Sequence, residues 1–175
     1  PNNLLPASYI CRRAVEEEEV EPQETVLVTL RMKNHDQEAD ETTFIISDQY
    51  SADYEIGSDL GKWFGDNYKD YTKPVLYSKA NDGNKLVFYS LPDASAEQWI
   101  PLGFWGGNVT QPITFSLRRN NRKLDYVKSV MLHDKTQNTY TELLKNDYQF
   151  APGSQTKLNG SRFEVKVLLE RPKNV

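Results

Sequence analysis

The fold is decided by residues 163–170 near the end of the chain, which read FEVKVLLE. The apolar residues Phe163, Val165 and Val167 are separated there by single charged residues. Successive side chains of a strand point to opposite faces, so this period of two is expected of a strand with one buried and one solvated face. This is the most regular alternation in the chain, and it predicts a sheet over a hydrophobic core.

The extended pattern recurs throughout the sequence, whereas helix signals are scarce. Eight further stretches carry it: 26–32, 42–47, 75–79, 85–91, 99–104, 113–117, 126–132 and 139–144. Many short strands separated by turns are typical of a sandwich or barrel. Only residues 58–64 could begin a short helix, with Ser58 as its cap. We therefore predict an all-β fold with little helix, an antiparallel β-sandwich of the jelly-roll or immunoglobulin-like kind.

Two local features and a predicted core refine this fold. Residues 80–84 contain Asp-Gly, which adopts positive φ at low cost and predicts a hairpin there. Pro101 has no N–H to donate, so residues 99–104 are expected at a sheet edge or a bulge. The inward faces supply the expected core: Val26, Val28, Leu30, Phe44, Ile46, Phe88, Phe115, Leu117, Val130, Leu132, Phe150, Phe163, Val165 and Val167.

Composition favours one folded domain. The 175 residues are 38% hydrophobic and 11% aromatic, and domains of about 150 residues are common. The aromatic content argues against a disordered chain. No apolar run approaches the roughly 18 residues that span a membrane, so we expect no membrane-spanning segment. We place an irregular acidic lead at residues 1–23, the β-sandwich domain at 24–170 and a tail at 171–175.

Charge is unevenly divided along the chain. Residues 25–109 carry 7 bases and 13 acids, whereas residues 110–175 carry 12 bases and 6 acids. The asymmetry fits either a basic part that grips an anion or two sets of strands that attract each other within one fold. Four bases in the turn 118–123 could hold an acidic polymer or only solubilise the turn. Because the front half is acidic and no base-stacking motif is visible, we expect no nucleic-acid partner.

Catalytic signatures are absent from the sequence. It has no G-x-S-x-G, no phosphate-binding loop and no dinucleotide motif. The single cysteine, Cys11, makes no internal disulfide or thiolate metal site. His35 and His133 both fall in predicted turns, which offer no fixed orientation for Ser/His/Asp chemistry. We therefore predict that the protein is not an enzyme.

Loop aromatics are the candidate binding residues. Trp63, Tyr68 and Tyr71 lie in a long loop among glycines and acids, and Trp105 follows a predicted strand. Exposed rings of this kind could stack on sugars, and long loops are often functional. The alternative is that these rings cover the open end of the core. Burial of Trp63 and Trp105 would remove the sugar-binding interpretation.

The same region could hold a cation. Calcium takes six to eight oxygen ligands from loops rich in Asp and backbone carbonyls. Asp53, Asp59 and Asp66 could supply carboxylates, although the spacing of a calcium-binding EF-hand loop is absent. A solvated polar loop is the alternative. Apart from this structural calcium ion, we expect no cofactor.

The order of several short motifs resembles a known module. Residues 100–103 read IPLG, residues 130–135 read VMLHDK, residues 148–150 read YQF and residues 162–165 read RFEV. From about Thr42 to Val167 the chain resembles a β-sandwich accessory module of Bacteroidetes-type secreted and cell-surface proteins. In such proteins the module often lies just upstream of a type IX secretion sorting domain.

The resemblance implies a role outside catalysis. It implies a structural or adhesin-like module that is secreted or displayed at the cell surface, next to other domains of a larger chain. A cell-surface glycan or protein is then the expected partner, and a carbohydrate-binding module that uses the loop aromatics is the alternative. No sorting domain follows Val175, which departs from the pattern. The resemblance carries no catalytic residues.

Five residues near the end of the chain are expected to act structurally. Tyr148 and Phe150 are two apart and should share one face of a strand, with Phe163 pointing to the same end of the core. Asp134 should accept backbone donors of the following turn. We predict that Arg162 pairs with Asp134 or with a loop carbonyl and holds this hairpin. A partly exposed pair of this kind is worth at most about 1 kcal/mol.

Overall fold

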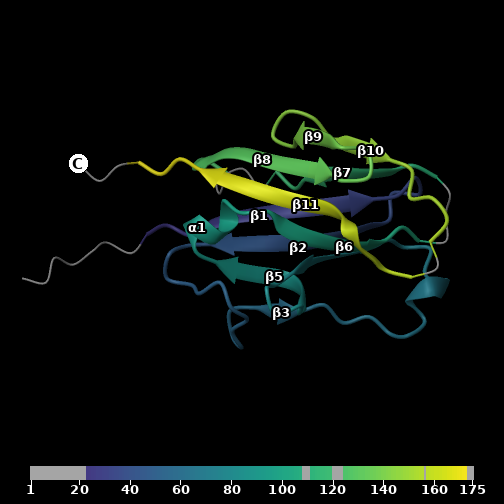
Figure 1. The fold of residues 1–175 in the computed structure, drawn as a ribbon, viewed down its shortest axis with the longest axis horizontal. Helices are drawn as coiled ribbons and strands as arrows, with labels where there is room; N and C mark the ends of the chain where they lie inside the picture. Colours follow the sequence, from purple (N-terminus) through teal and green to yellow (C-terminus); the bar gives the residue numbers. More distant parts are fainter. Residues whose placement is uncertain (1–22, 108–110, 120–123, 156, 173–175) are drawn as a thin grey trace, which may run out of the picture.

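The computed structural model describes residues 23–107, 111–119, 124–155 and 157–172, and it is built almost entirely of strands (Figure 1). Of these residues 49% are in strands and 5% in helices. The predicted all-β class with little helix is therefore confirmed. The acidic lead up to residue 22, the turn residues 120–123 and the last three residues of the tail lie outside the described residues.

Eleven strands and two short helical turns make up the described chain. They are β1 (Val26–Lys33), β2 (Ala39–Ile46), β3 (Leu60–Gly61), η1 (Tyr68–Asp70), β4 (Val75–Lys79), β5 (Lys85–Leu91), α1 (Asp93–Ala96), β6 (Ile100–Trp105), β7 (Ile113–Leu117), β8 (Val127–Asp134), β9 (Thr139–Glu142), β10 (Tyr148–Phe150) and β11 (Asn159–Leu169). The hairpin predicted from Asp-Gly joins β4 to β5, with Gly83 at φ 89° in its turn.

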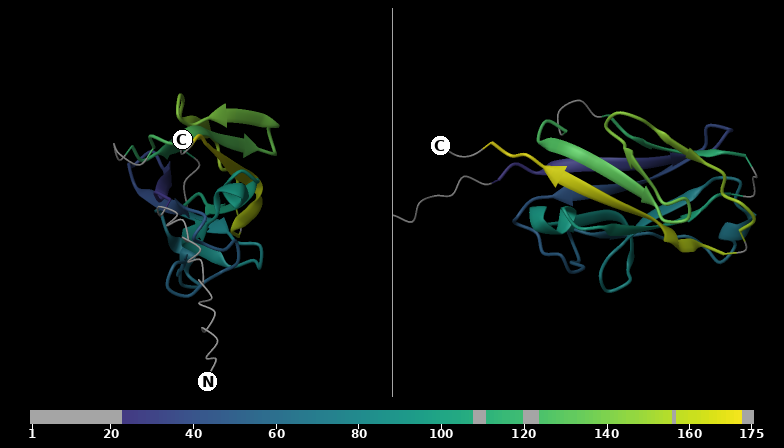
Figure 2. Two further views of the ribbon diagram at one scale, coloured as in Figure 1. Left: turned by 90° about the vertical axis from the view of Figure 1, so that its left-hand side faces the viewer. Right: turned by 45° about the horizontal axis from the view of Figure 1, so that its top comes forward.

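The strands form one sheet, which differs from the predicted pair of antiparallel sheets. Its order is β10-β7-β1-β2-β5-β4-β6-β11-β8-β9, with β3 added to β5. The sheet is mixed because β2 and β5 are parallel, and it curls into a nearly closed barrel (Figure 2). The parallel pair arises because β5 leaves its hairpin partner β4 after Leu86 and joins β2 from Phe88 onward.

The interior of the barrel is the predicted core with one exception. All the predicted core residues are buried except Phe88, which is 39% exposed. The alternation of β5 is reset where the strand changes partners, so Leu86 and Tyr89 point inward and Phe88 points outward. Four phenylalanines, Phe104, Phe115, Phe150 and Phe163, fill one end with ring centroids 4.7–5.5 Å apart.

One other local prediction is wrong, and of the two alternatives predicted for Pro101 the edge position is not found. Residues 58–64 contain the two-residue strand β3 and no helix, and the Lys62 N–H donates to Lys85 O and ties this segment to β5. Pro101 lies in β6, which is paired on both sides, by β4 and β11, and is not an edge strand. Its partner β11 shifts register between Asn159 and Phe163, so an irregularity does lie next to the proline.

The first and last strands are fastened together at one end of the barrel. Arg171 follows β11, and its guanidinium donates to both carboxylate oxygens of Asp93 and to the backbone oxygens of Glu24 and Ile46. The bidentate pair with Asp93 raises the pKa of Arg171 above its ordinary value. The start of β1 and the end of β11 are thereby held side by side.

Candidate functional site

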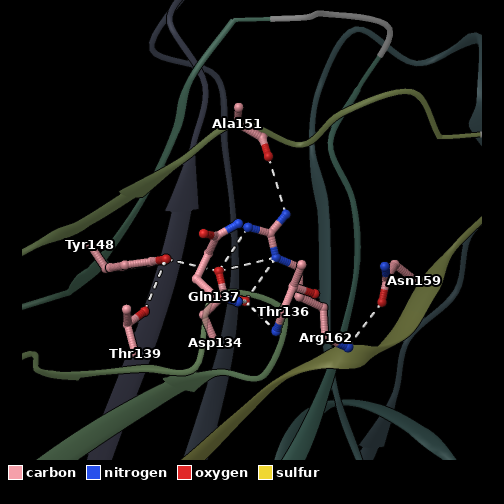
Figure 3. A network of polar contacts seen from close by, with 8 residues as sticks. All are labelled: Asp134, Thr136, Gln137, Thr139, Tyr148, Ala151, Asn159 and Arg162. Carbon is pink, nitrogen blue, oxygen red and sulfur yellow. Dashed lines mark hydrogen bonds and ion pairs between the residues drawn. The ribbon is translucent and has the colours of Figure 1, made fainter.

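A buried polar network lies where the two ends of the sheet approach each other (Figure 3). Asp134 ends β8, Tyr148 begins β10 and Arg162 belongs to β11. The Arg162 Nη2 and Nε atoms donate to Asp134 Oδ2 at 2.7 and 3.1 Å, and the Tyr148 hydroxyl donates to the same oxygen at 2.8 Å. We call Asp134, Tyr148 and Arg162 the closing network.

Backbone groups complete the closing network. The N–H groups of Thr136 and Gln137 donate to Asp134 Oδ1 at 2.9 and 3.2 Å, as expected of an aspartate that opens a turn. Arg162 Nη1 donates to Ala151 O, just after β10, at 3.1 Å. Arg162 was predicted to pair with Asp134 or with a loop carbonyl, and it contacts both. These contacts connect β8, β10 and β11.

The closing network is more deeply buried than the sequence suggested. The side chains of Arg162 and Asp134 are only 11% and 1% exposed, so the pair is more buried than the sequence predicted. Arg162 is covered because its guanidinium carbon lies 4.8 Å and 4.9 Å from the ring centroids of Phe150 and Phe163. A cation placed over aromatic faces is stabilised by them.

Protonation of the closing network follows from these contacts. Burial alone would raise the pKa of Asp134, but hydrogen bonds from Arg162, Tyr148 and the Gln137 backbone outweigh it and lower that pKa below its ordinary value of 3.8. Burial, and then the hydrogen bond to Asp134, raise the pKa of Tyr148 above its ordinary value of 10. Near neutral pH the network therefore holds a charged carboxylate and a protonated phenol.

Exposed apolar side chains surround β3. This strand lies on the opposite side of the barrel from β8 and β9 (Figure 1). Six large apolar or aromatic side chains are exposed among the described residues, and five of them lie here. We call these five, Tyr54, Ile56, Leu60, Trp63 and Phe88, the Trp63 face. Contiguous exposed apolar surface of this kind marks interaction sites on soluble proteins.

The backbone beneath the Trp63 face is firmly held. Asp59 Oδ1 accepts from both the N–H and the hydroxyl of Ser90 in β5, and Asp59 Oδ2 accepts from the Glu55 N–H. Gly57, at φ 108°, makes the preceding turn. These bonds fix β3 against β5, so Leu60 and Trp63 are presented by an anchored segment.

An open groove of about 630 Å³ lies along the Trp63 face. Tyr54, Ile56, Leu60 and Trp63 supply its apolar lining. Its polar lining includes Lys62, which is paired with Asp40, and the turn residues 83–85. Trp63 is 91% exposed, so one indole ring stands almost free beside groups that can form hydrogen bonds.

The structure separates the four predicted binding aromatics. Trp105 is only 2% exposed, and its Nε1 donates to Tyr71 O at 3.4 Å, so Trp105 cannot contact a ligand and that prediction is wrong. Tyr68 packs edge-on against Trp105 and Phe64, with centroids 5.5 and 5.7 Å away. These rings cover the end of the core, which was the alternative. Tyr71 is half-buried and its hydroxyl donates to Asn67 Oδ1 at 3.3 Å, whereas Trp63 is the one of the four that is almost fully exposed.

The structure places the three predicted calcium ligands in different surroundings. Asp59 is buried and both its oxygens already accept internal hydrogen bonds, whereas Asp53 and Asp66 are exposed loop residues. Within the described residues no group of three or more His, Cys, Asp or Glu side chains could hold a metal ion. The carboxylate of Asp59 is used to anchor β3.

Sequence reasoning missed the environment of His133. It lies in β8 and not in a turn, and its ring stacks on Tyr140 at 4.2 Å with an interplanar angle of 5°. Its Nδ1 lies 2.8 Å from Glu164 Oε1. The Lys166 ammonium lies 4.6 Å from the ring of neighbouring Trp99. The alternation of residues 126–132 was a signal for its position, because continuing the alternation by one residue places His133 in the strand.

Comparison with known proteins adds no relative. No protein-family model, curated protein or solved structure matches this chain. Neither helical turn in the described part of the chain has the length and hydropathy of a membrane-spanning helix. The resemblance to a secreted Bacteroidetes-type module therefore stays a prediction, and the candidate function has to be argued from the two sites themselves.

Proposed function

We propose that this chain is a non-catalytic structural or adhesin-like module of a secreted or cell-surface bacterial protein, and that it makes contact through the Trp63 face. The observation that carries the proposal is the gathering of five exposed apolar side chains, four on the anchored segment 54–63 and the fifth, Phe88, on the paired strand β5. Tryptophan and tyrosine are enriched among the residues that dominate binding energy at interfaces. The order of motifs quoted above adds the expected cellular context.

The rigidity of the barrel supports this role. A contact surface loses less conformational entropy on binding when its residues are already held in place. Trp63 is attached to β3, which Asp59 fixes to β5, and the barrel itself is closed by the closing network. A partner would therefore meet a surface of fixed shape.

The test is adhesion of the labelled protein to intact bacterial cells and to plates coated with purified extracellular proteins. We expect Trp63→Ala to reduce binding by about tenfold or more, as truncation of a central anchor does. Tyr140→Ala is the matched control, because Tyr140 is exposed but lies on β9 away from the Trp63 face. Equal adhesion of the wild-type and Trp63→Ala proteins would contradict the proposal.

A carbohydrate-binding module is the second candidate. The nearly free Trp63 ring, beside Tyr54 and polar turn residues in an open groove, is the observation that favours it. A glycan array should then give specific signals that Trp63→Ala removes and Tyr140→Ala retains. Signals that persist in Trp63→Ala would exclude this face as the sugar site.

A further inference from the structure

We propose that this chain associates head to tail with a second copy of itself, the Trp63 face of one copy docking on the basic side of the next. The proposal rests on the proposed function of the Trp63 face as a contact surface and names its partner. It combines two features of the fold, a separation of charge between two sides of the barrel and an exposed indole on the acidic side.

The sheet order sorts the charges in space. Strands β7 to β11, from the basic part of the chain, occupy both ends of the sheet order, and the two ends meet at the closing network. Strands β1 to β5, from the acidic part, lie on the other side, with β3 outermost (Figures 1 and 2). Within the described residues, positions 25–107 carry 7 bases and 13 acids, a net charge of −6, and positions 111–172 carry 9 bases and 6 acids, a net charge of +3. The charge difference between the two parts of the chain is therefore also a difference between two sides of the barrel.

The rim of the Trp63 face is acidic. Asp53 and Glu55 flank Tyr54, and Asp82 precedes the turn residues that line the groove; all three are exposed. The two lysines that line the groove are turned to partners within the chain. Lys62 is paired with Asp40, and the Lys85 ammonium lies 5.4 Å from the Phe64 ring centroid. The face thus offers an apolar centre with carboxylates beside it.

Three bases in the part of the chain after residue 110 are exposed and make no ion pair with another described residue, and we call these three, Arg119, Lys128 and Lys145, the basic cluster. Arg118 is excluded because it is paired with Glu41 of β2. Arg119 Nη2 donates to Leu144 O at 3.0 Å, which places this arginine beside Lys145. Lysine and arginine cations bind best to the face of an indole ring, and carboxylates near that ring add attraction.

The two surfaces lie on different sides of the molecule, which determines the kind of assembly. When unlike surfaces bind, a pair of copies still has one free surface of each kind, so further copies can add at both ends. Growth stops only if the rotation between successive copies closes a ring. The expected assembly is therefore a chain that lengthens with protein concentration. Because its attraction is largely electrostatic at the rim, it should weaken as salt increases.

Sedimentation equilibrium of the purified protein over a wide concentration range, at low and high salt, tests the proposal. We expect the weight-average mass to rise past that of two copies at low salt and to fall at high salt. Trp63→Ala and the double variant Lys128→Glu/Lys145→Glu should each stay monomeric. Lys69→Glu/Lys73→Glu, which makes the same charge change at exposed positions of the acidic part, should still associate.

Mixing provides the decisive measurement. Trp63→Ala retains the basic cluster and Lys128→Glu/Lys145→Glu retains the Trp63 face, so an equimolar mixture should form pairs and stop there. A wild-type protein that is monomeric at every concentration would overturn the proposal. A dimer that Lys128→Glu/Lys145→Glu leaves unchanged would also overturn it, because such a dimer does not use the basic cluster. Trp63-dependent adhesion by a monomeric protein would preserve the proposed function while removing this inference.

Discussion

The closing network buries charged side chains, whereas the Trp63 face exposes apolar ones. Arg162 and Asp134 are charged, yet their side chains are 11% and 1% exposed; Ile56 and Trp63 are apolar, yet they are 93% and 91% exposed. Both oxygens of Asp134 accept hydrogen bonds from within the chain, so we expect Asp134 to stabilise the fold. The Trp63 side chain is almost fully exposed, so we expect it to act in contact with another molecule.

The largest expected effect comes from removing the cation of the closing network. Arg162→Ala leaves the Asp134 carboxylate buried without its main partner, and breaking a buried pair in this way typically costs about 3–5 kcal/mol. Urea unfolding near neutral pH measures the loss. Arg162→Lys keeps the charge but lacks the planar guanidinium that reaches both Asp134 and Ala151. Its free energy of unfolding should therefore lie between those of the wild type and Arg162→Ala. If Arg162→Ala lowers the free energy of unfolding by less than about 0.5 kcal/mol, the range of an ordinary surface change, the closing network would contribute no more to stability than the exposed Trp63 face.

A packing change shows whether the sensitivity of the barrel is confined to buried charge. Gly103 in β6 is paired with Tyr77 in β4, and a Cβ atom at Gly103 would lie 1.9 Å from Tyr77 Cζ. Gly103→Ala should therefore cost about 1–3 kcal/mol through overpacking.

The double variant Gly103→Ala/Tyr77→Leu isolates the cause of that loss. It removes the clashing ring carbon, so its stability should be close to that of Tyr77→Leu alone. If Gly103→Ala is equally destabilising in both backgrounds, contact with the Tyr77 ring is not the reason, and the tight β4–β6 approach would have to be explained by the backbone.

The closing network was the part of the molecule most accessible to sequence reasoning. Asp134 opens a polar turn and Arg162 precedes a strand residue that points into the core, so both local signals agree with the final contact. Its depth could not be predicted, because burial of Arg162 comes from Phe150 and Phe163, whose rings are brought together only by curling of the whole sheet.

The Trp63 face shows the limit of such reasoning. The pattern of residues 57–71 could not show which of its aromatics would point outward, because Phe64 and Tyr68 are turned inward by contacts with Tyr77 and Trp105 on distant strands. Phe88 was predicted inside because a strict period of two was assumed along β5. The alternation along β5 is reset where the strand changes its partner from β4 to β2. The local sequence carries no signal of this change.

A smaller effect is expected from acid. Because the pKa of Asp134 is lowered by folding, its contribution to stability is complete above its ordinary value of 3.8 and is lost as the pH falls through the lower folded value. Each pKa unit of difference corresponds to about 1.4 kcal/mol. The free energy of unfolding should therefore decrease as the pH falls below about 4, and Asp134→Asn should flatten that decrease. Asp66→Asn, at an exposed carboxylate, is the control. A decrease that is unchanged in Asp134→Asn would assign the acid response to other groups.

The smallest effect on stability is expected at the Trp63 face, and it completes the comparison. Trp63→Ala removes a large ring, but a side chain that is 91% exposed loses almost no buried contact, so the free energy of unfolding should stay within about 0.5 kcal/mol of wild type. The same truncation at Phe163, in the core, typically costs about 3–5 kcal/mol. Urea unfolding of the two variants side by side measures both. If Trp63→Ala destabilises the chain by more than about 1 kcal/mol, beyond a surface change, the ring would be supporting the fold of the loop, and its exposure could no longer be attributed to a contact with another molecule.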